Sequence, residues 1–163
     1  MEQQYPKRKP NRLKTFDYSS VGFYFITICT KNKEKLFGYV QDGDEWNLPQ
    51  MVLSDFGKIV SEQIQTIQNA KHVLIDHYVV MPNHIHLILI VNPHDEAEKT
   101  PANATVPHTI GAFKRLCSKR LGEDVFQRSF HDRIIRNQKE YEKIWQYISD
   151  NPRKWKEDCF FSE

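Results

Sequence analysis

Apolar residues recur with two different periods along this chain, and the changes between them mark the predicted elements. Residues 21–30, VGFYFITICT, are rich in β-branched and aromatic side chains, which is typical of a strand. From 52 to 68, apolar residues recur at steps of three and four, which predicts an amphipathic helix. Two more strands are predicted at 73–80 and 84–91, on either side of a break at Pro82, which cannot donate a backbone hydrogen bond.

The second half of the chain predicts a loop, a helix, a strand and a last helix. Residues 92–108 are polar with three prolines, which predicts a flexible loop. A helix is predicted at 109–121, with an apolar stripe on one side and basic residues on the other. A strand at 129–136 and a helix at 138–150 follow, and Pro152 limits that helix. The stripe of the 109–121 helix consists of Ile110, Phe113, Leu116, Cys117 and Leu121.

The order of these elements predicts the fold class. Between the first strand and the first helix, residues 35–50 carry Asp-Gly-Asp between short apolar pieces, which predicts a hairpin or a long excursion. Without that excursion and the last helix, the order is βαββαβ, that of a ferredoxin-like α+β sandwich. We therefore expect one domain over residues 1–163. It has a mainly antiparallel sheet with helices on one face and, in addition, a C-terminal tyrosine-bearing helix, and the other face of the sheet is open to hold a site.

Composition fits such a folded domain and excludes several other classes. The chain is 39% hydrophobic and 12% aromatic, which excludes a disordered protein. No stretch approaches the roughly 20 apolar residues of a membrane span, and the N-terminus lacks the apolar region of a signal peptide. Cys29, Cys117 and Cys159 form no CxxC pattern. We expect a cytoplasmic protein with reduced thiols and no membrane partner.

Positive charge is clustered although the net charge is only +2. Residues 1–14 form a basic tail, and residues 107–121 carry four basic residues and no acid. Clustered positive charge suits a polyanion such as DNA. A frayed tail and a solvated helix face have the same composition, so charge leaves both interpretations open.

Two histidines interrupt the apolar strand predicted at 84–91. Alternate residues of a strand point to the same face, so His84 and His86 point together, with side-chain bases about 6 to 7 Å apart. Two imidazoles at that separation can converge on one divalent ion. They are also compatible with two histidines satisfied by ordinary hydrogen bonds. In either case a polar group must face them, because burying imidazoles without partners costs free energy.

The last predicted helix offers polar groups that suit this task. Tyr147 and Asn151 are four residues apart, so they share a helix face. At about 100° per residue, both lie at the edge of the apolar stripe. Tyr147 is thus placed to lean from the core into a cleft, although an ordinary boundary tyrosine would have the same position. The stripe is centred on Tyr141, Ile144, Trp145 and Ile148.

These motifs resemble those of a known family. MPNHIHLIL resembles the HUH motif, two histidines around a bulky apolar residue, and YISDNP resembles the tyrosine motif of the single-tyrosine HUH transposases. Four further segments resemble the REP-associated tyrosine transposase branch, and the likeness runs from about residue 12 to 156. These segments are DYSSVGFYFITICTKNKEKLFG, LSDFGKIV, SFHDRIIRN and YISDNPRKW.

The resemblance implies a ferredoxin-like enzyme that nicks single-stranded DNA beside hairpins through a covalent 5′-phosphotyrosine. By motif, it implies that His84, His86 and Asn151 bind a divalent ion, Mg²⁺ or Mn²⁺, and that Tyr147 is the nucleophile. Asn151 stands where related transposases often carry Gln, which is one methylene longer. Some members of the family are monomers and others are homodimers, so both assemblies stay open.

In DNA strand transfer, each of these groups would have a chemical role. A divalent cation held by two histidines and an amide would neutralise the phosphoryl oxygens. A tyrosine nucleophile keeps the phosphodiester energy in a protein–DNA bond, so that strands rejoin without ATP. The reference pKa of tyrosine is about 10, and the sequence shows no dedicated general base.

The expected function is a metal-dependent, single-stranded DNA endonuclease and strand transferase at hairpin-flanked sites. An alternative is a domesticated hairpin-binding protein that no longer cuts. An RNA-binding module is disfavoured, because the strands at 21–30 and 84–91 carry no RNP-like aromatic signature. Phosphate contacts are expected from Lys114, Arg115, Lys119, Arg120, Arg133 and Arg136.

Overall fold

Four strands form one antiparallel sheet, in the order β4-β5-β1-β6. This order is the ferredoxin-like one, with β1 between the β4–β5 hairpin and β6, so the predicted fold class is confirmed. The computed structural model describes residues 21–67, 73–92 and 105–161. The predicted basic tail at 1–14 and residues 93–104 of the predicted loop lie outside them. The strands are β1 (Gly22–Cys29), β4 (Val73–Met81), β5 (His84–Val91) and β6 (His131–Ile135).

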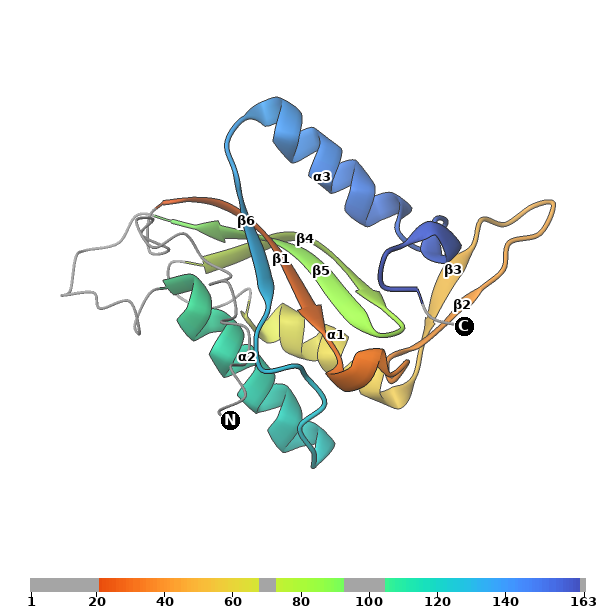
Figure 1. The fold of residues 1–163 in the computed structure, drawn as a ribbon, viewed down its shortest axis with the longest axis horizontal. Helices are drawn as coiled ribbons and strands as arrows, with labels where there is room; N and C mark the ends of the chain where they lie inside the picture. The colour runs from red at the N-terminus through yellow and green to blue at the C-terminus, as the bar shows by residue number, and fades with distance from the viewer. Residues whose placement is uncertain (1–20, 68–72, 93–104, 162–163) are drawn as a thin grey trace, which may run out of the picture.

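Helices cover the two faces of the sheet unequally (Figure 1). Helices α1 (Asp55–Ile67) and α2 (Thr105–Leu121) lie side by side on one face, where they bury the larger hydrophobic cluster. Helix α3 (Gln138–Asp150) crosses the other face over a smaller cluster. The alternating side-chain directions of β5, which is buried on both faces, explain both clusters, because Ile85, Leu87 and Leu89 point to α1 and α2 while Ile88 and Ile90 point to α3. The α3 face is thus the one that keeps room for a site.

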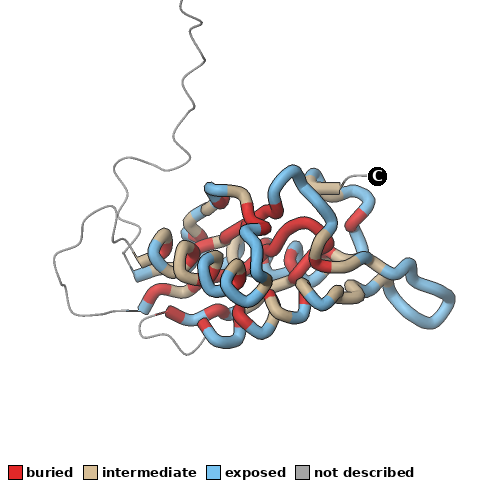
Figure 2. Tube along the Cα trace, turned by 90° about the horizontal axis from the view of Figure 1, so that it is seen from below, coloured by how far each residue is buried: buried red, intermediate tan, exposed pale blue. Residues whose placement is uncertain are grey.

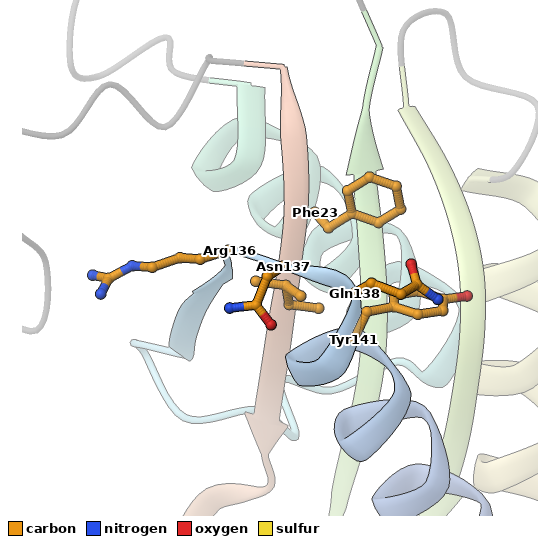
Figure 3. Close-up of a pocket in the computed structure, with 6 residues that line it drawn as sticks. Phe23, Arg136, Asn137, Gln138 and Tyr141 are labelled. Atoms are coloured by element: carbon orange, nitrogen blue, oxygen red, sulfur yellow. The ribbon is translucent and has the colours of Figure 1, made fainter.

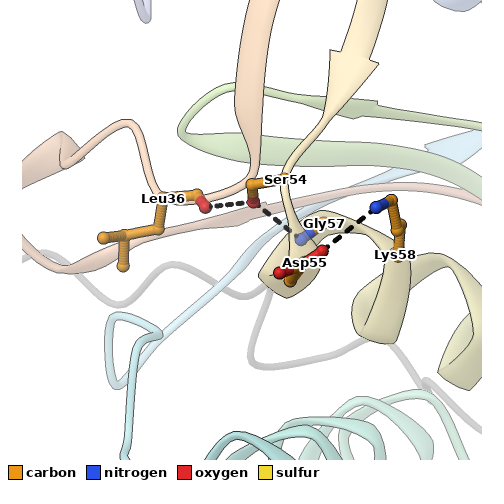
Figure 4. Close-up of polar contacts among 5 residues, drawn as sticks. All are labelled: Leu36, Ser54, Asp55, Gly57 and Lys58. Carbon is orange, nitrogen blue, oxygen red and sulfur yellow. Dashed lines mark hydrogen bonds and ion pairs between the residues drawn. The ribbon is translucent and has the colours of Figure 1, made fainter.

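The predicted excursion is a hairpin of β2 (Gly38–Gln41) and β3 (Gln50–Leu53). Its loop is exposed and projects from one end of the molecule, whereas buried residues follow the central sheet (Figure 2). The chain then enters α1 through Ser54. The Ser54 hydroxyl accepts from the Gly57 amide at 3.1 Å and donates to the Leu36 carbonyl at 2.6 Å (Figure 4). One side chain therefore caps α1 and ties it to the preceding loop.

Two sequence predictions differ from the structure. Helix α2 begins at Thr105, inside the predicted loop, because Pro107 in the first turn needs no intrahelical N–H partner. Leu116 is 45% exposed, and Trp145 is 40% exposed, instead of lying in the buried stripes. Trp145 stacks on His77 of β4, with ring centroids 4.2 Å apart and an interplanar angle of 9°. Within the three described ranges, no helix is long and apolar enough to cross a membrane.

Candidate metal and tyrosine site

The two histidines lie on β5 and face α3, as the alternation of the strand predicts. His84 and His86 are 0% and 1% exposed, and their ring centroids are 4.4 Å apart. β5 pairs with β1 on one side and β4 on the other. This central position in the sheet gives the imidazoles a rigid support.

Hydrogen bonds fix the orientation of both imidazoles. The Asn83 amide donates to the carbonyls of Lys33 and Phe160, at 3.2 and 2.8 Å, so its Oδ1 must face the other way. That oxygen lies 2.9 Å from His84 Nδ1 and can only accept, which places the ring proton on Nδ1. The Thr27 hydroxyl, which can donate or accept, lies 2.8 Å from His86 Nδ1 and holds the orientation of that ring. His84 Nε2 is therefore left with a lone pair directed into the site.

Burial keeps both imidazoles neutral. Desolvation lowers the pKa of His84 from 6.5 to about 4, and the Asp158 charge and the Asn151 amide offset only part of this effect. Burial also lowers the pKa of His86 well below its usual value, and the neighbouring His84 lowers it further. Neutral imidazoles are the form that binds metal ions.

Helix α3 brings the predicted tyrosine and asparagine to the histidines. Asn137 caps the helix, its side chain accepting from the Glu140 amide, while Ile144 and Ile148 anchor one face on the sheet. The Tyr147 hydroxyl lies 3.2 Å from His86 Nε2, and Asn151 is buried at the C-terminal end of the helix. The predicted juxtaposition of these groups is thus present within a single chain.

Asp158 is a member of the site that the sequence analysis missed. It follows the short 3-10 helix Trp155–Glu157, eleven residues after Tyr147. Its Oδ2 accepts from the Tyr147 hydroxyl at 3.2 Å and from the Asn151 amide at 2.8 Å. The chain then continues to Phe160, whose ring lies 4.6 Å from that of His84. No helical or strand period marks Asp158, so only the fold reveals its place.

The surroundings of Tyr147 favour the protonated phenol. Its pKa is raised above the usual value, first by burial and then by the charge and the hydrogen bond of the Asp158 carboxylate. Tyr147 remains 40% exposed, so a substrate can reach it from solvent. The one carboxylate in contact with the hydroxyl is also placed to accept its proton.

The donor set fits a divalent cation. His84 Nε2 and Asn151 Oδ1 are buried and have no hydrogen-bond partner of ordinary geometry in the described ranges. Because the Asn151 amide nitrogen donates to Asp158, its oxygen is the atom left for a ligand. One ligand atom from each of His84, His86 and Asp158 lies within 4.8 Å of the others, close to the roughly 4.2 Å that two ligands of one Mg²⁺ can span. Buried nitrogen and oxygen atoms whose lone pairs have no hydrogen-bond partner are what a cation site requires.

The predicted phosphate contacts fall into two groups. Lys114, Arg115, Lys119 and Arg120 belong to α2, on the sheet face opposite Tyr147. Lys114 donates to the carbonyls of Gln127 and Ser129, and Arg120 pairs with Glu62 of α1 at 2.6 Å. Arg133 and Arg136 lie on the α3 side. Arg133 pairs with Glu140 at 2.5 Å, and Arg136 lies directly before α3.

Comparisons with known proteins give a relative in sequence and likenesses in structure. No family model matches the chain. An uncharacterized protein of Haemophilus influenzae is 36% identical over 174 aligned residues, which cover 94% of this chain and 93% of the relative. At this identity and coverage, the two chains share one family.

The structural likenesses concern transposases. The structure of a REP-associated tyrosine transposase bound to a REP hairpin matches with a TM-score of 0.62 at 20% identity, over 88% of this chain and 74% of that chain. A putative transposase from Deinococcus radiodurans matches with a TM-score of 0.50 at 15% identity, over 85% of this chain and 97% of that chain. At these identities the likeness shows a common fold.

Proposed function

This chain belongs to one family with the Haemophilus influenzae protein and has the fold of a REP-associated tyrosine transposase; on this premise we propose that it is a transposase-like enzyme of the HUH type. It would cut and rejoin single-stranded DNA beside a hairpin. The observation that carries this proposal is the contact of Tyr147 with the buried His86, whose ring packs against that of the buried His84, an arrangement that the HxH and tyrosine motifs predict together. The transposase fold supports the family that the motifs resemble.

Tyr147 acts as the nucleophile. Its oxygen attacks a backbone phosphorus, a tyrosine–phosphorus bond forms, and the bond to the 3′ oxygen breaks. The departing 3′ oxygen takes up a proton and becomes a 3′-hydroxyl. A 3′-hydroxyl that attacks the phosphotyrosine then restores the phosphodiester and releases Tyr147, so no external energy source is needed.

Asp158 accepts the phenolic proton. It is the carboxylate that already holds the Tyr147 hydroxyl, at 3.2 Å. In the resting site the same contact raises the pKa of Tyr147, so the phenol stays protonated until substrate charge and geometry change that balance. Asp158 would therefore be both the restraint on the nucleophile and its proton acceptor.

His84, His86 and Asn151 would hold a divalent cation, Mg²⁺ or Mn²⁺. Such an ion, when bound, neutralises charge on the phosphoryl oxygens. Asn83 and Thr27 keep the two imidazoles in the required orientation, and Asp158 turns the Asn151 oxygen toward them. Mg²⁺ prefers oxygen ligands and Mn²⁺ tolerates imidazole better, so this mixed set suits Mn²⁺.

The DNA lies on the α3 face, where Arg133 and Arg136 are placed for phosphate contacts. The basic side of α2 would contact only DNA that extends around the edge of the sheet. A single chain supplies both the tyrosine and the histidines, so we propose that the site works without a second copy.

A cleavage assay tests this function. A DNA hairpin with single-stranded extensions, labelled at one end, is incubated with the full chain and Mn²⁺ or Mg²⁺. We expect a cut strand with a free 3′-hydroxyl, and we expect EDTA, His84→Ala or His86→Ala to abolish cutting while hairpin binding persists. Hairpin binding that is indifferent to EDTA, with no cutting under either metal, would instead support the non-cutting alternative.

The assignment of the third ligand has its own test. Binding of Mn²⁺ to the free protein is measured for Asn151→Ala and for Asp158→Asn. We expect Asn151→Ala to weaken binding and Asp158→Asn to affect it much less. The opposite pattern would make Asp158 the ligand and would leave Tyr147 without this proton acceptor.

A further inference from the structure

A pocket of about 410 Å³ lies beside the N-terminal end of α3, on the sheet face that this helix crosses (Figure 3). Its volume falls in the range of about 300 to 1,000 Å³ that is usual for small-ligand sites. No catalytic role assigned above uses any of its side chains, except that Arg136 is a proposed phosphate contact. The lining residues are Phe23, Ile135, Arg136, Asn137, Gln138 and Tyr141.

Aromatic rings form one side of this pocket. Phe23 is 41% exposed although it lies in β1, and its ring meets that of Tyr141 edge to face at 5.7 Å and 77°. The Tyr141 hydroxyl donates to Asp76 at 2.6 Å, which fixes that ring. An exposed, firmly supported ring is suited to stacking against another flat group.

Amide groups form another side. Asn137 uses its Oδ1 to cap α3, and Gln138 uses its Nε2 to bond Glu142, at 2.9 Å in each case. Neither Asn137 Nδ2 nor Gln138 Oε1 bonds to any residue in the described ranges, so one donor and one acceptor remain for a ligand. The Arg136 side chain extends away from these groups, beside the pocket (Figure 3). A flat ring, a donor–acceptor pair and a nearby cation match a nucleotide with an unpaired base.

A row of β1 side chains runs from the pocket to the proposed catalytic site. Alternate residues of β1 point toward α3, and these are Phe23 at the pocket, Phe25, and Thr27 at His86. The Phe25 ring lies 5.2 Å from that of His86 and 6.0 Å from that of Tyr147. Along α3, Tyr141 precedes Tyr147 by six residues, which corresponds to about 9 Å. A few nucleotides of extended single strand can cover that distance.

We propose that this pocket holds an unpaired base of the DNA strand that Tyr147 cuts, with the base stacked on Phe23 and its edge read by Asn137 and Gln138. This inference rests on the proposed function and adds a substrate-binding site to it. It explains why β1 exposes a phenylalanine on the face that carries the catalytic groups.

Binding in EDTA separates this site from catalysis. One probe is a DNA hairpin with single-stranded extensions of mixed base composition, and the other is the same hairpin with extensions of sugar–phosphate units that lack bases. We expect the wild type to bind the first probe about tenfold or more tightly, since stacking of one base has effects of that order. Phe23→Ala and Phe23→Leu should bind both probes equally. Trp46→Ala, which removes a ring that is 85% exposed on the β2–β3 hairpin, should keep the preference.

Each other result has a defined meaning. Equal binding of both probes by the wild type overturns the base pocket and leaves hairpin binding intact. An unchanged preference in both Phe23 variants also overturns it, and so does equal weakening on both probes, which would give Phe23 a purely structural role. Failure to bind either probe contradicts the proposed function together with this inference.

Photocrosslinking locates the base directly. The mixed extensions carry a single 5-iodouridine at successive positions, and crosslinked peptides are identified by mass spectrometry. At one position we expect the crosslink on the peptide that contains Phe23 or Tyr141. Crosslinks found only on other peptides would contradict the assignment.

Discussion

The orientation of two imidazole rings is decided by two neutral side chains, Thr27 and Asn83. Both are buried, and each contacts the Nδ1 atom of one histidine. Groups that orient ligands in this way typically change metal affinity by about 10- to 100-fold when they are removed.

Thr27→Val tests this role with little change in shape. We expect the variant to bind Mn²⁺ about 10- to 100-fold more weakly, because His86 loses the partner that holds the orientation of its ring. Titration of the free protein with Mn²⁺ measures the effect. Thr27→Ser should retain affinity, and Thr66→Val is a control, because the exposed Thr66 hydroxyl bonds only within α1. Equal affinity of wild type and Thr27→Val would contradict the role.

The Asp158 carboxylate contributes to the raised pKa of Tyr147, the proposed nucleophile. In Asp158→Asn the pKa of Tyr147 should fall, because the negative charge that disfavours the phenolate is removed. Ultraviolet titration of the phenols, with Tyr147→Phe subtracted to isolate this residue, measures the change. A pKa of Tyr147 that is the same in both proteins would show that Asp158 does not restrain it.

At the scale of single residues, the sequence predicts the site residues that have a regular spacing and misses Asp158, which has none. His84 and His86 share a strand face, and Tyr147 and Asn151 share a helix face, so periodicity alone brings each pair together. Asp158 reaches the site only because the chain turns back after α3. That turn depends on tertiary packing, which no local pattern encodes.

Among the elements, α3 matters most, because it carries Tyr147, the proposed nucleophile, across the sheet. Its start is set by Asn137, which accepts from the Glu140 amide. The helix contacts the sheet through one face, which carries Ile144 and Ile148, while Trp145 lies at the β4 edge of the sheet. A helical wheel cannot distinguish the buried Ile144 and Ile148 from the half-exposed Trp145, because it does not show where the sheet ends.

Removal of the α3 cap should weaken the whole domain modestly. We expect Asn137→Ala to lower the free energy of unfolding by about 1 kcal/mol, the usual value of such a cap. Asn137→Asp keeps an accepting oxygen and should retain most of that stability. Urea unfolding followed by circular dichroism compares the variants. A stability loss in Asn137→Asp as large as in Asn137→Ala would show that the side-chain acceptor is not what matters.

At the scale of the whole molecule, the buried histidines link stability to pH. The pKa of His84 is 6.5 in the unfolded chain and about 4 in the folded one, so the unfolded state binds more protons between these values. Metal-free protein should therefore be fully stabilised by this group above about pH 6.5 and lose that stability as the pH falls toward 4. The loss is on the order of a few kcal/mol.

Unfolding experiments in EDTA across this range measure the effect. His84→Gln should show a shallower dependence of stability on pH, because it removes the buried titrating group. Other acids also titrate at the low end, so the difference between the two proteins is the relevant quantity. Parallel curves for wild type and His84→Gln would contradict the assignment.

The architecture of the whole molecule was predictable because its order of elements belongs to a known sandwich, and the sheet order β4-β5-β1-β6 bears this out. The distribution of the basic residues over the two opposite faces of the sheet was not predictable. Lys114 and Arg120 of α2 face intramolecular partners on the far side of the sheet, a placement that follows from packing and not from charge pattern.

The central claim is that Tyr147 forms a covalent bond to DNA, and peptide mapping of the trapped complex tests it most directly. The full chain is incubated with hairpin DNA and Mn²⁺, denatured and digested, and the peptide that retains a nucleotide is identified by mass spectrometry. The account predicts a 5′-phosphotyrosine at Tyr147, absent in EDTA and in Tyr147→Phe. Cleavage that persists in Tyr147→Phe, or an adduct on another residue, would contradict it.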